Sequence, residues 1–281
     1  MAAAVTRVPV AAIRIAPSRR LFSVPLGELW ANRELLYFFV WRDIKVRYKQ
    51  TAIGAAWALL QPTLTMLAFT LFFGKLAKLP TNGVPYPLFY YCAVLPWTYF
   101  ATALQSSTNS IVEQQRLITK IYFPRLVLPI SAVLAGLVDF VVAFGVLAAL
   151  MVYYRIIPGH AVLFLPGFVV LALLTALGFG LWLAALNAVY RDVRYVVPFL
   201  VQFWMFASPV AYSSSMVPGR WRWIYGLNPM AGVIEGFRWA LTGQGLAPGS
   251  LFAASGCGVI VVLLGGMLYF RSMESTVADL V

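Results

Sequence analysis

Histidine, cysteine and acidic residues are scarce in this sequence, which has one histidine, two cysteines and nine Asp or Glu residues. Cys92 and Cys257 lie in different apolar stretches without a C-x-x-C or Cys/His spacing, so neither a metal site nor a disulfide framework is indicated. A spaced pair of membrane carboxylates, a G-x-S-x-G nucleophile motif and a G-x-x-x-x-G-K-S/T phosphate loop are also missing. We therefore predict no catalytic residue, no metal and no cofactor bound by this chain.

Charged residues are few as well: they make up 11% of the 281 residues, against 62% apolar residues. Soluble domains have about 25% charged and about 45–50% apolar residues, and a soluble fold could not bury this much apolar surface. Since a membrane-spanning helix needs about 20 apolar residues, the length accommodates one all-α integral membrane domain.

Six stretches of the chain are long enough to span a bilayer and carry almost no formal charge. Clusters of Pro, Gly and Asn at their ends supply turns. The predicted spans are 52–74, 86–109, 126–154, 161–188, 195–213 and 249–271.

The orientation of these spans follows from the Lys and Arg residues between them, since cytoplasmic segments carry the excess. Residues 1–51, the second and fourth connections and the C-terminus together hold fifteen, whereas the alternate connections hold six. Both termini are therefore predicted to be cytoplasmic. We therefore interpret most of the net charge of +12 as setting the orientation of the spans in the membrane, and we expect no nucleic-acid partner.

The N-terminal segment divides into two parts. Residues 1–25 are basic, with no acid and no continuous apolar run, and we expect a disordered cytosolic tail rather than a secretory signal, with a transit peptide as the alternative. Residues 26–49 predict an amphipathic interface helix on the cytoplasmic leaflet, serving as a membrane anchor or as a docking surface. Its candidate residues are Trp30, Tyr37, Trp41, Arg42 and Lys45.

The connection between the second and third spans predicts a short cytoplasmic helix that ends at Pro124. It combines charged residues with more apolar surface than a simple turn needs, so it is either a contact for a partner or a lipid-contacting turn. Its candidate residues are Glu113, Arg116, Lys120, Tyr122 and Phe123.

The connection before the last span is too long for a turn and predicts two short helices split at Asn228–Pro229. The pair forms either a re-entrant lid over an exit path or an interfacial hairpin. Its candidate residues are Trp221, Trp223, Asn228, Pro229, Glu235 and Arg238.

Asp139 is the one acidic residue within a predicted span. A charge at the centre of a bilayer costs about 3 kcal/mol on insertion scales, so this carboxylate needs a partner. We expect a packing contact to a hydroxyl or an arginine, with a functional site as the alternative.

From about Leu26 onward the chain resembles the permease subunits of ABC-2-type transporters that export polysaccharides such as O-antigen and teichoic acid. The segments that carry the resemblance are Arg42 to Gly54 (RDIKVRYKQTAIG) with Trp57 and Gln61-Pro62, Lys120 to Pro129 (KIYFPRLVLP), Tyr190 to Arg194 (YRDVR), Ser208-Pro209-Val210, Leu227 to Met230 (LNPM) and Glu235-Gly-Phe-Arg238.

This resemblance implies that residues 50–281 form an ABC-2 type transmembrane domain, present as a homodimer in a bacterial inner membrane. Two copies of a cytosolic ATP-binding subunit would hold ATP and Mg and drive a lipid-linked polysaccharide outward. The helix from Glu113 to Phe123 would be the coupling helix seated on the ATPase, residues 26–49 would contact the same subunit, and the hairpin before the last span would be the outer gate.

Aromatic side chains suit the conduit, because their faces stack on the C–H faces of sugar rings. The channel candidates are Phe69, Phe72, Phe73, Trp97, Tyr99, Phe100, Phe203, Trp204 and Phe206. For most of them, a position facing lipid or packed between helices is the alternative. Two alternatives stay open: an ABC-2 exporter of drugs or lipids, and a multispan glycan-modifying membrane enzyme.

Overall fold

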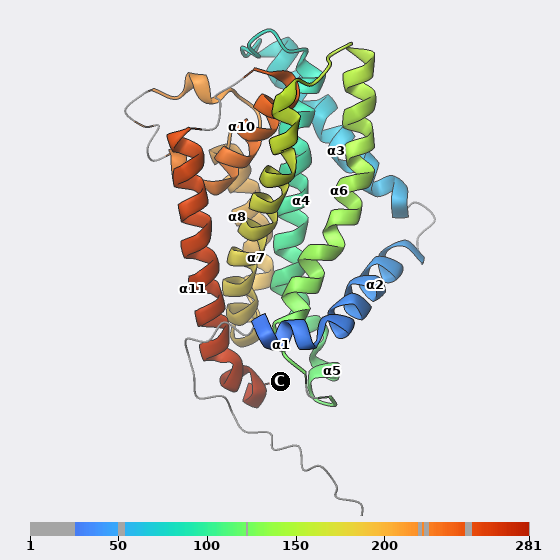
Figure 1. Cartoon of the computed structure of the whole chain (residues 1–281), viewed down its shortest axis with the longest axis vertical. Helices are drawn as coiled ribbons and strands as arrows, with labels where there is room; N and C mark the ends of the chain where they lie inside the picture. The colour runs from blue at the N-terminus through green and yellow to red at the C-terminus, as the bar shows by residue number, and fades with distance from the viewer. Residues whose placement is uncertain are drawn as a thin grey trace, which may run out of the picture.

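The computed structural model describes residues 26–49, 54–121, 123–218, 221, 225–244 and 249–280, and these residues form a helical bundle without a strand (Figure 1). The helices, in chain order, are α1 (Leu26–Ala31), α2 (Arg33–Lys49), α3 (Gly54–Phe69), η1 (Thr70–Leu76), α4 (Tyr86–Glu113), α5 (Gln115–Ile118), α6 (Val127–Tyr153), η2 (His160–Phe164), α7 (Leu165–Val189), α8 (Val193–Ala207), η3 (Ser214–Met216), α10 (Pro229–Thr242) and α11 (Ser250–Leu280). The prediction of an all-α protein is confirmed.

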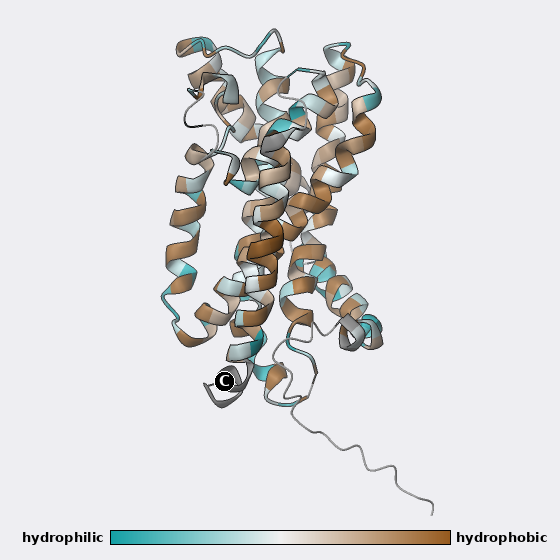
Figure 2. Cartoon of the chain, turned by 60° about the vertical axis from the view of Figure 1, so that its left-hand side comes forward, coloured by the Kyte–Doolittle hydropathy of each residue, from teal (hydrophilic) through white to brown (hydrophobic). Residues whose placement is uncertain are grey.

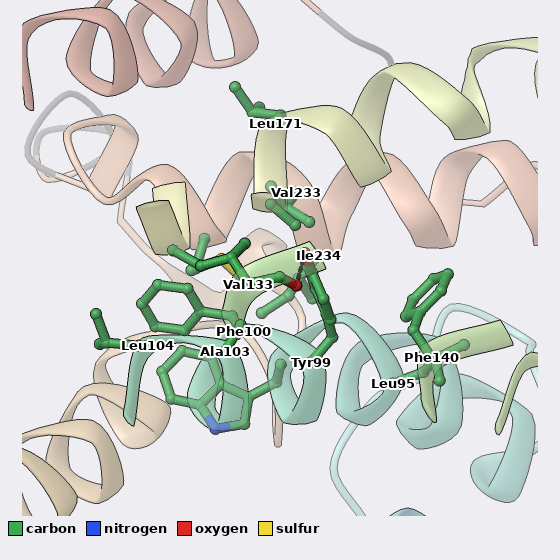
Figure 3. Close-up of a cluster of buried hydrophobic side chains, with 14 of the residues drawn as sticks. Leu95, Tyr99, Phe100, Ala103, Leu104, Val133, Phe140, Leu171, Val233 and Ile234 are labelled. Carbon is green, nitrogen blue, oxygen red and sulfur yellow. Dashed lines mark hydrogen bonds between the residues drawn. The ribbon is translucent and has the colours of Figure 1, made fainter. Parts of the chain in front are cut away.

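Helix α4 lies at the centre of the bundle and packs against α3, α6, α7, α8 and α10. Large side chains on α4, among them Leu95, Phe100 and Leu104, are almost fully buried. Figure 3 shows this cluster, in which α4 residues meet Val133 and Phe140 of α6 and Val233 and Ile234 of α10. Because lipid tails are as apolar as these side chains, close packing rather than transfer from water holds such helices together.

Four helical segments in the described residues are long and apolar enough to cross a membrane: Ala56–Leu76, Val127–Tyr153, His160–Val189 and Phe252–Met273. Figure 2 shows apolar residues along the middle of the long helices and hydrophilic residues gathered at the two ends of the bundle. These segments correspond to four of the six predicted spans.

The other two predicted spans, 86–109 and 195–213, correspond to α4 and α8, which are not among these four segments. Helix α4 has 28 residues, about 42 Å at a rise of ~1.5 Å per residue, but it is less apolar because neighbouring helices shield it from lipid. Helix α8 ends at Ala207, short of the predicted residue 213. Pro209 explains this end, since it favours extended backbone at Ser208, whose φ and ψ are −106° and 154°.

Helices α7 and α11 pack closely along their lengths, and glycine makes this approach possible. A Cβ atom on Gly266 would lie 2.6 Å from the carbonyl oxygen of Gly178, and a Cβ on Gly178 would lie 3.1 Å from the backbone nitrogen of Leu263. Small residues at these positions therefore let the two backbones touch.

Helix α2 runs obliquely from the lower end of the bundle upward along α6 (Figure 1). A break at Asn32 divides the predicted helix 26–49 into α1 and α2, and residues 1–25 lie outside the described residues. Tyr37 and Trp41 point away from the bundle, with exposed fractions of 69% and 47%, whereas Phe39 is buried against it. The aromatic stripe thus faces lipid or headgroups, and a different face holds the helix to the protein.

Candidate functional site

The loop between α4 and α6 protrudes at the end of the bundle where α1 lies (Figure 1). The predicted helix from Glu113 to Phe123 is wrong in extent: α4 already includes Glu113, and α5 is a single turn from Gln115 to Ile118. Residues 119–121 form turns rather than further helix, and Phe123 is buried. The apolar residues of the segment explain this, because Leu117 and Ile118 pack back onto the core and Phe123 packs onto α2 instead of lying along one helical face.

Two cations of this loop are directed outward. Arg116 and Lys120 are exposed, as is Ile121 at 58%, while Tyr122 lies outside the described residues. The loop therefore offers a small protrusion with a basic and apolar surface, anchored from behind by Leu117 and Ile118.

Helix α2 contacts this loop through Arg42 and Phe39. The Arg42 guanidinium donates to Oε1 of Gln114 at 2.9 Å and to Oδ1 of Asp43 at 2.8 Å. It also lies over the Phe39 ring at 4.6 Å, and Phe39 in turn packs on Phe123 at 5.5 Å between centroids. Hydrogen bonds to a charged group are among the stronger ones, so this contact links the predicted interface helix to the predicted coupling segment.

An acidic group belongs to the same cluster. Glu113 follows the predicted span 86–109, and partial burial together with the nearby Asp43 carboxylate raises its pKa, while Arg42 opposes the shift. Charge is thus concentrated where α2, α4 and α5 meet, and the guanidinium of Arg42 offsets the two carboxylates.

The far end of α2 contacts α6. Arg47 forms an ion pair with Asp139, and the Tyr48 hydroxyl donates to the same carboxylate. Both partners that the sequence suggested for Asp139, an arginine and a hydroxyl, are present. The helix that touches the α4–α6 loop at Arg42 therefore reaches the middle of α6 one and a half turns later.

The segment before α11 contains a buried ion pair between Glu235 and Arg238, 3.3 Å apart. Arg238 also donates to the carbonyl oxygens of Val210 and Tyr212, at 3.0 and 3.1 Å, and lies 3.7 Å from the centroid of the Phe89 ring. These contacts fasten the non-helical chain after α8 onto α10 and α4. Backbone carbonyls outside a helix need such donors within a membrane, because lipid offers none.

Asn228 and Pro229 begin α10 as predicted. The Asn228 side chain accepts from the Met230 amide at 3.1 Å and from Trp204 Nε1 at 3.0 Å, and donates to Ser208 Oγ at 2.9 Å. Trp221 is exposed at 51%, and Trp223 lies outside the described residues, as do its two neighbours in the predicted first helix of the pair.

The predicted channel aromatics divide into two groups. Trp97, Tyr99 and Phe100 are buried, and Phe69, Phe73 and Trp204 pack against the same core, so within one chain these rings form helix-to-helix contacts. The others are exposed: Phe72 at 57%, Phe203 at 69% and Phe206 at 54%. Of the nine predicted channel aromatics, these three are the exposed ones.

Phe39, Asp43, Arg47 and Gln114 were not among the predicted site residues, although they make the central contacts. A signal for Phe39 was present, since Leu35, Leu36, Phe39 and Asp43 recur at three- and four-residue spacing on one side of the helix. Gln114 gave no signal, because a lone glutamine in a polar loop predicts no particular partner.

Comparisons with known proteins agree on one family. The family model described as ABC-2 type transporter matches residues 34–242. An O-antigen export system permease protein of Myxococcus xanthus is 30% identical over 255 residues, which cover 90% of this chain and 97% of the relative. A Klebsiella pneumoniae protein of the same description is 28% identical over 76% of this chain and 81% of its own length. A polysialic acid transport protein of Escherichia coli is 25% identical over 83% of this chain and 91% of its own length.

Proposed function

The chain belongs to the ABC-2 type transporter family, and from this premise we propose that it is the permease subunit of an ATP-driven exporter of a polysaccharide or lipid-linked polysaccharide. One observation carries the substrate class: the relatives that match over most of their lengths are permeases for O-antigen export and a transporter of polysialic acid. The sequence has no phosphate loop, so ATP and Mg belong to a separate cytosolic subunit.

The contact between α2 and the α4–α6 loop supports a coupling role for this end of the bundle. ATP binding can shift the equilibrium between two permease conformations only if the ATPase contacts those conformations differently. Arg116 and Lys120 are exposed there for such a contact, and Leu117 and Ile118 join the loop to the core. A displacement of the loop by the ATPase is therefore transmitted to α4 and, through the hydrogen bond between Gln114 and Arg42, to α2.

The remaining parts of the proposal concern the assembly. The permease acts as a homodimer with two ATP-binding subunits in the inner membrane, with both termini in the cytoplasm. The exposed Phe72, Phe203 and Phe206 are the aromatic residues a conduit between two copies would use, and the segment from Trp221 to α10 forms its outer gate. Fifteen basic residues in the predicted cytoplasmic segments, against six outside, support the orientation.

The proposal is tested by deleting the gene and measuring polysaccharide on the cell surface and inside the cell. We expect surface polysaccharide to disappear and to accumulate inside, and the full chain to restore export. Normal surface polysaccharide in the deletion strain, together with a new sensitivity to drugs, would contradict the proposed substrate class.

A further inference from the structure

A cavity of about 280 Å³ lies between α3, α4 and α6 of the single chain. Its walls include residues 95–106 of α4 and 136–143 of α6, which are the middle parts of these two long helices. Arg47 at the end of α2 and its partner Asp139 also line it. The cavity is separate from the exposed aromatic rings of α8, none of which lines it.

Four polar side chains face this cavity without a hydrogen bond to any described residue. They are the amides of Gln61 and Gln105 and the hydroxyls of Thr98 and Ser106. In contrast, the Tyr99 hydroxyl donates to the Val133 carbonyl at 3.3 Å, the bond drawn in Figure 3. Polar groups at the middle of a membrane helix cost free energy unless water or a ligand binds them, so the cavity is built to hold something polar.

The charge and the side chains of the cavity lining limit the kind of ligand that the cavity can bind. Arg47 and Asp139 neutralise each other, and a phosphate would have to compete with the Asp139 carboxylate for the guanidinium. Each glutamine amide offers both donors and an acceptor, which matches hydroxyl groups that also donate and accept. Trp57, exposed at 58%, and the Phe140 ring add apolar faces to the same lining.

We propose that this cavity binds one neutral sugar unit within each permease subunit. The assignment rests on the proposed export of polysaccharide and adds a site to it. The cavity volume of about 280 Å³ is just below the ~300–1,000 Å³ of typical small-molecule pockets. This volume suits one sugar ring and excludes a longer stretch of polysaccharide. The Arg47–Asp139 pair in its wall places the bound sugar next to α2, the helix that also contacts the coupling loop.

The test uses cysteine protection in the full permease, co-purified with its ATP-binding subunit in lipid nanodiscs. Ala58→Cys places a thiol in the cavity, and Lys78→Cys, at an exposed residue after η1, serves as a reference in the same molecule. Of the native cysteines, Cys92 is buried and Cys257 lies within the apolar segment Phe252–Met273 of α11, where a thiol reacts poorly. Modification by N-ethylmaleimide is followed by mass spectrometry at positions 58 and 78. The probe is octyl β-D-glucoside, and the control is tetraethylene glycol monooctyl ether, which has the same alkyl chain without a sugar.

We expect octyl glucoside to slow modification at position 58 by about threefold or more, as for a site more than half occupied, and to leave the rate at position 78 unchanged. The ether should protect neither thiol. Adding Gln61→Leu or Gln105→Leu to the Ala58→Cys/Lys78→Cys chain should abolish the protection, and size-exclusion chromatography identifies any variant that fails to fold. Two variants are used so that one folding failure does not remove the test.

Equal rates with and without octyl glucoside would overturn the sugar site and leave a water-filled cavity. Equal protection by the glucoside and the ether would overturn it in favour of an alkyl-chain site. Either result in an Ala58→Cys permease that still exports polysaccharide in cells refutes this site alone. A chain that neither restores export nor co-purifies with an ATPase refutes the proposed function first.

Discussion

Arg47 of α2 and Asp139 of α6 form an ion pair at the middle of a 27-residue helix. Five residues earlier on α2, Arg42 binds Gln114 in the loop between α4 and α6. One short helix thus connects the predicted contact for the ATPase to the membrane interior. A rigid element held at both ends can transmit a displacement, provided that it has two arrangements.

Removing one member of the Arg47–Asp139 pair should destabilise the permease. We expect Asp139→Asn and Arg47→Gln each to cost about 1–2 kcal/mol, less than the ~3–5 kcal/mol of a fully buried pair, because the two side chains are 24% and 34% exposed. Thermal unfolding monitored by size-exclusion chromatography measures this. The double variant should recover much of the loss, and additive losses would contradict a direct pair.

Arg42→Ala should weaken coupling more than it weakens folding. It removes the 2.9 Å hydrogen bond to Gln114 at a partly exposed site, where such a bond contributes about 1 kcal/mol. Stimulation of ATP hydrolysis by the permease should fall about fivefold while the amount of folded permease stays the same. Lys49→Ala, on an exposed residue of the same helix, is the control; equal losses in both variants would exclude a specific role for Arg42.

Replacing Arg116 and Lys120 together with alanine should reduce co-purification with the ATP-binding subunit. Both residues are exposed, so insertion and thermal stability should not change. Because exposed charges are screened by salt, raising the salt concentration should weaken the wild-type complex in the same direction. Lys75→Ala with Lys78→Ala, at exposed residues in η1 and in the segment that follows it, is the matched control. Retention of full binding by the Arg116/Lys120 variant would place the ATPase contact elsewhere.

Gly266→Ala should disturb the contact between α7 and α11. The added Cβ would lie 2.6 Å from the Gly178 carbonyl oxygen, and overpacking of this kind costs about 1–3 kcal/mol. The midpoint of thermal unfolding should fall accordingly. A Cβ atom on Gly256 of the same helix meets nothing within 4 Å, so Gly256→Ala should leave the midpoint unchanged or raise it slightly, because alanine favours a helix more than glycine does. A similar drop in both variants would contradict the packing explanation.

Apolar periodicity and charge predicted most of the fold. The predicted spans 126–154 and 161–188 agree closely with α6 and with η2 plus α7, because long runs with almost no charge leave few other structures for the chain in a membrane. The extent of the coupling helix was mispredicted, because helix-forming residues such as Leu117 and Ile118 do not show that they pack sideways onto the bundle. Packing against the bundle therefore determines where this helix ends.

The candidate site was predicted only in part, because its contacts join residues that are far apart in the sequence. Arg42 was identified from its place on the interface helix, but its partner Gln114 is 72 positions away and no local pattern connects the two. Asp139 was correctly expected to have an arginine or hydroxyl partner, because an unpaired carboxylate inside a membrane is costly. The identity of that partner, Arg47, depends on the oblique course of α2, which no sequence pattern specifies.

The central claim is that this chain carries polysaccharide across the membrane when a separate subunit binds and hydrolyses ATP. Inverted membrane vesicles that contain the permease and its ATP-binding subunit test it most directly, with radiolabelled lipid-linked polysaccharide added outside. With ATP, the label should become protected from an added glycosidase, and the Arg116→Ala/Lys120→Ala permease should protect far less. Protection that is the same without ATP, or no protection in vesicles that still hydrolyse ATP, would contradict the account.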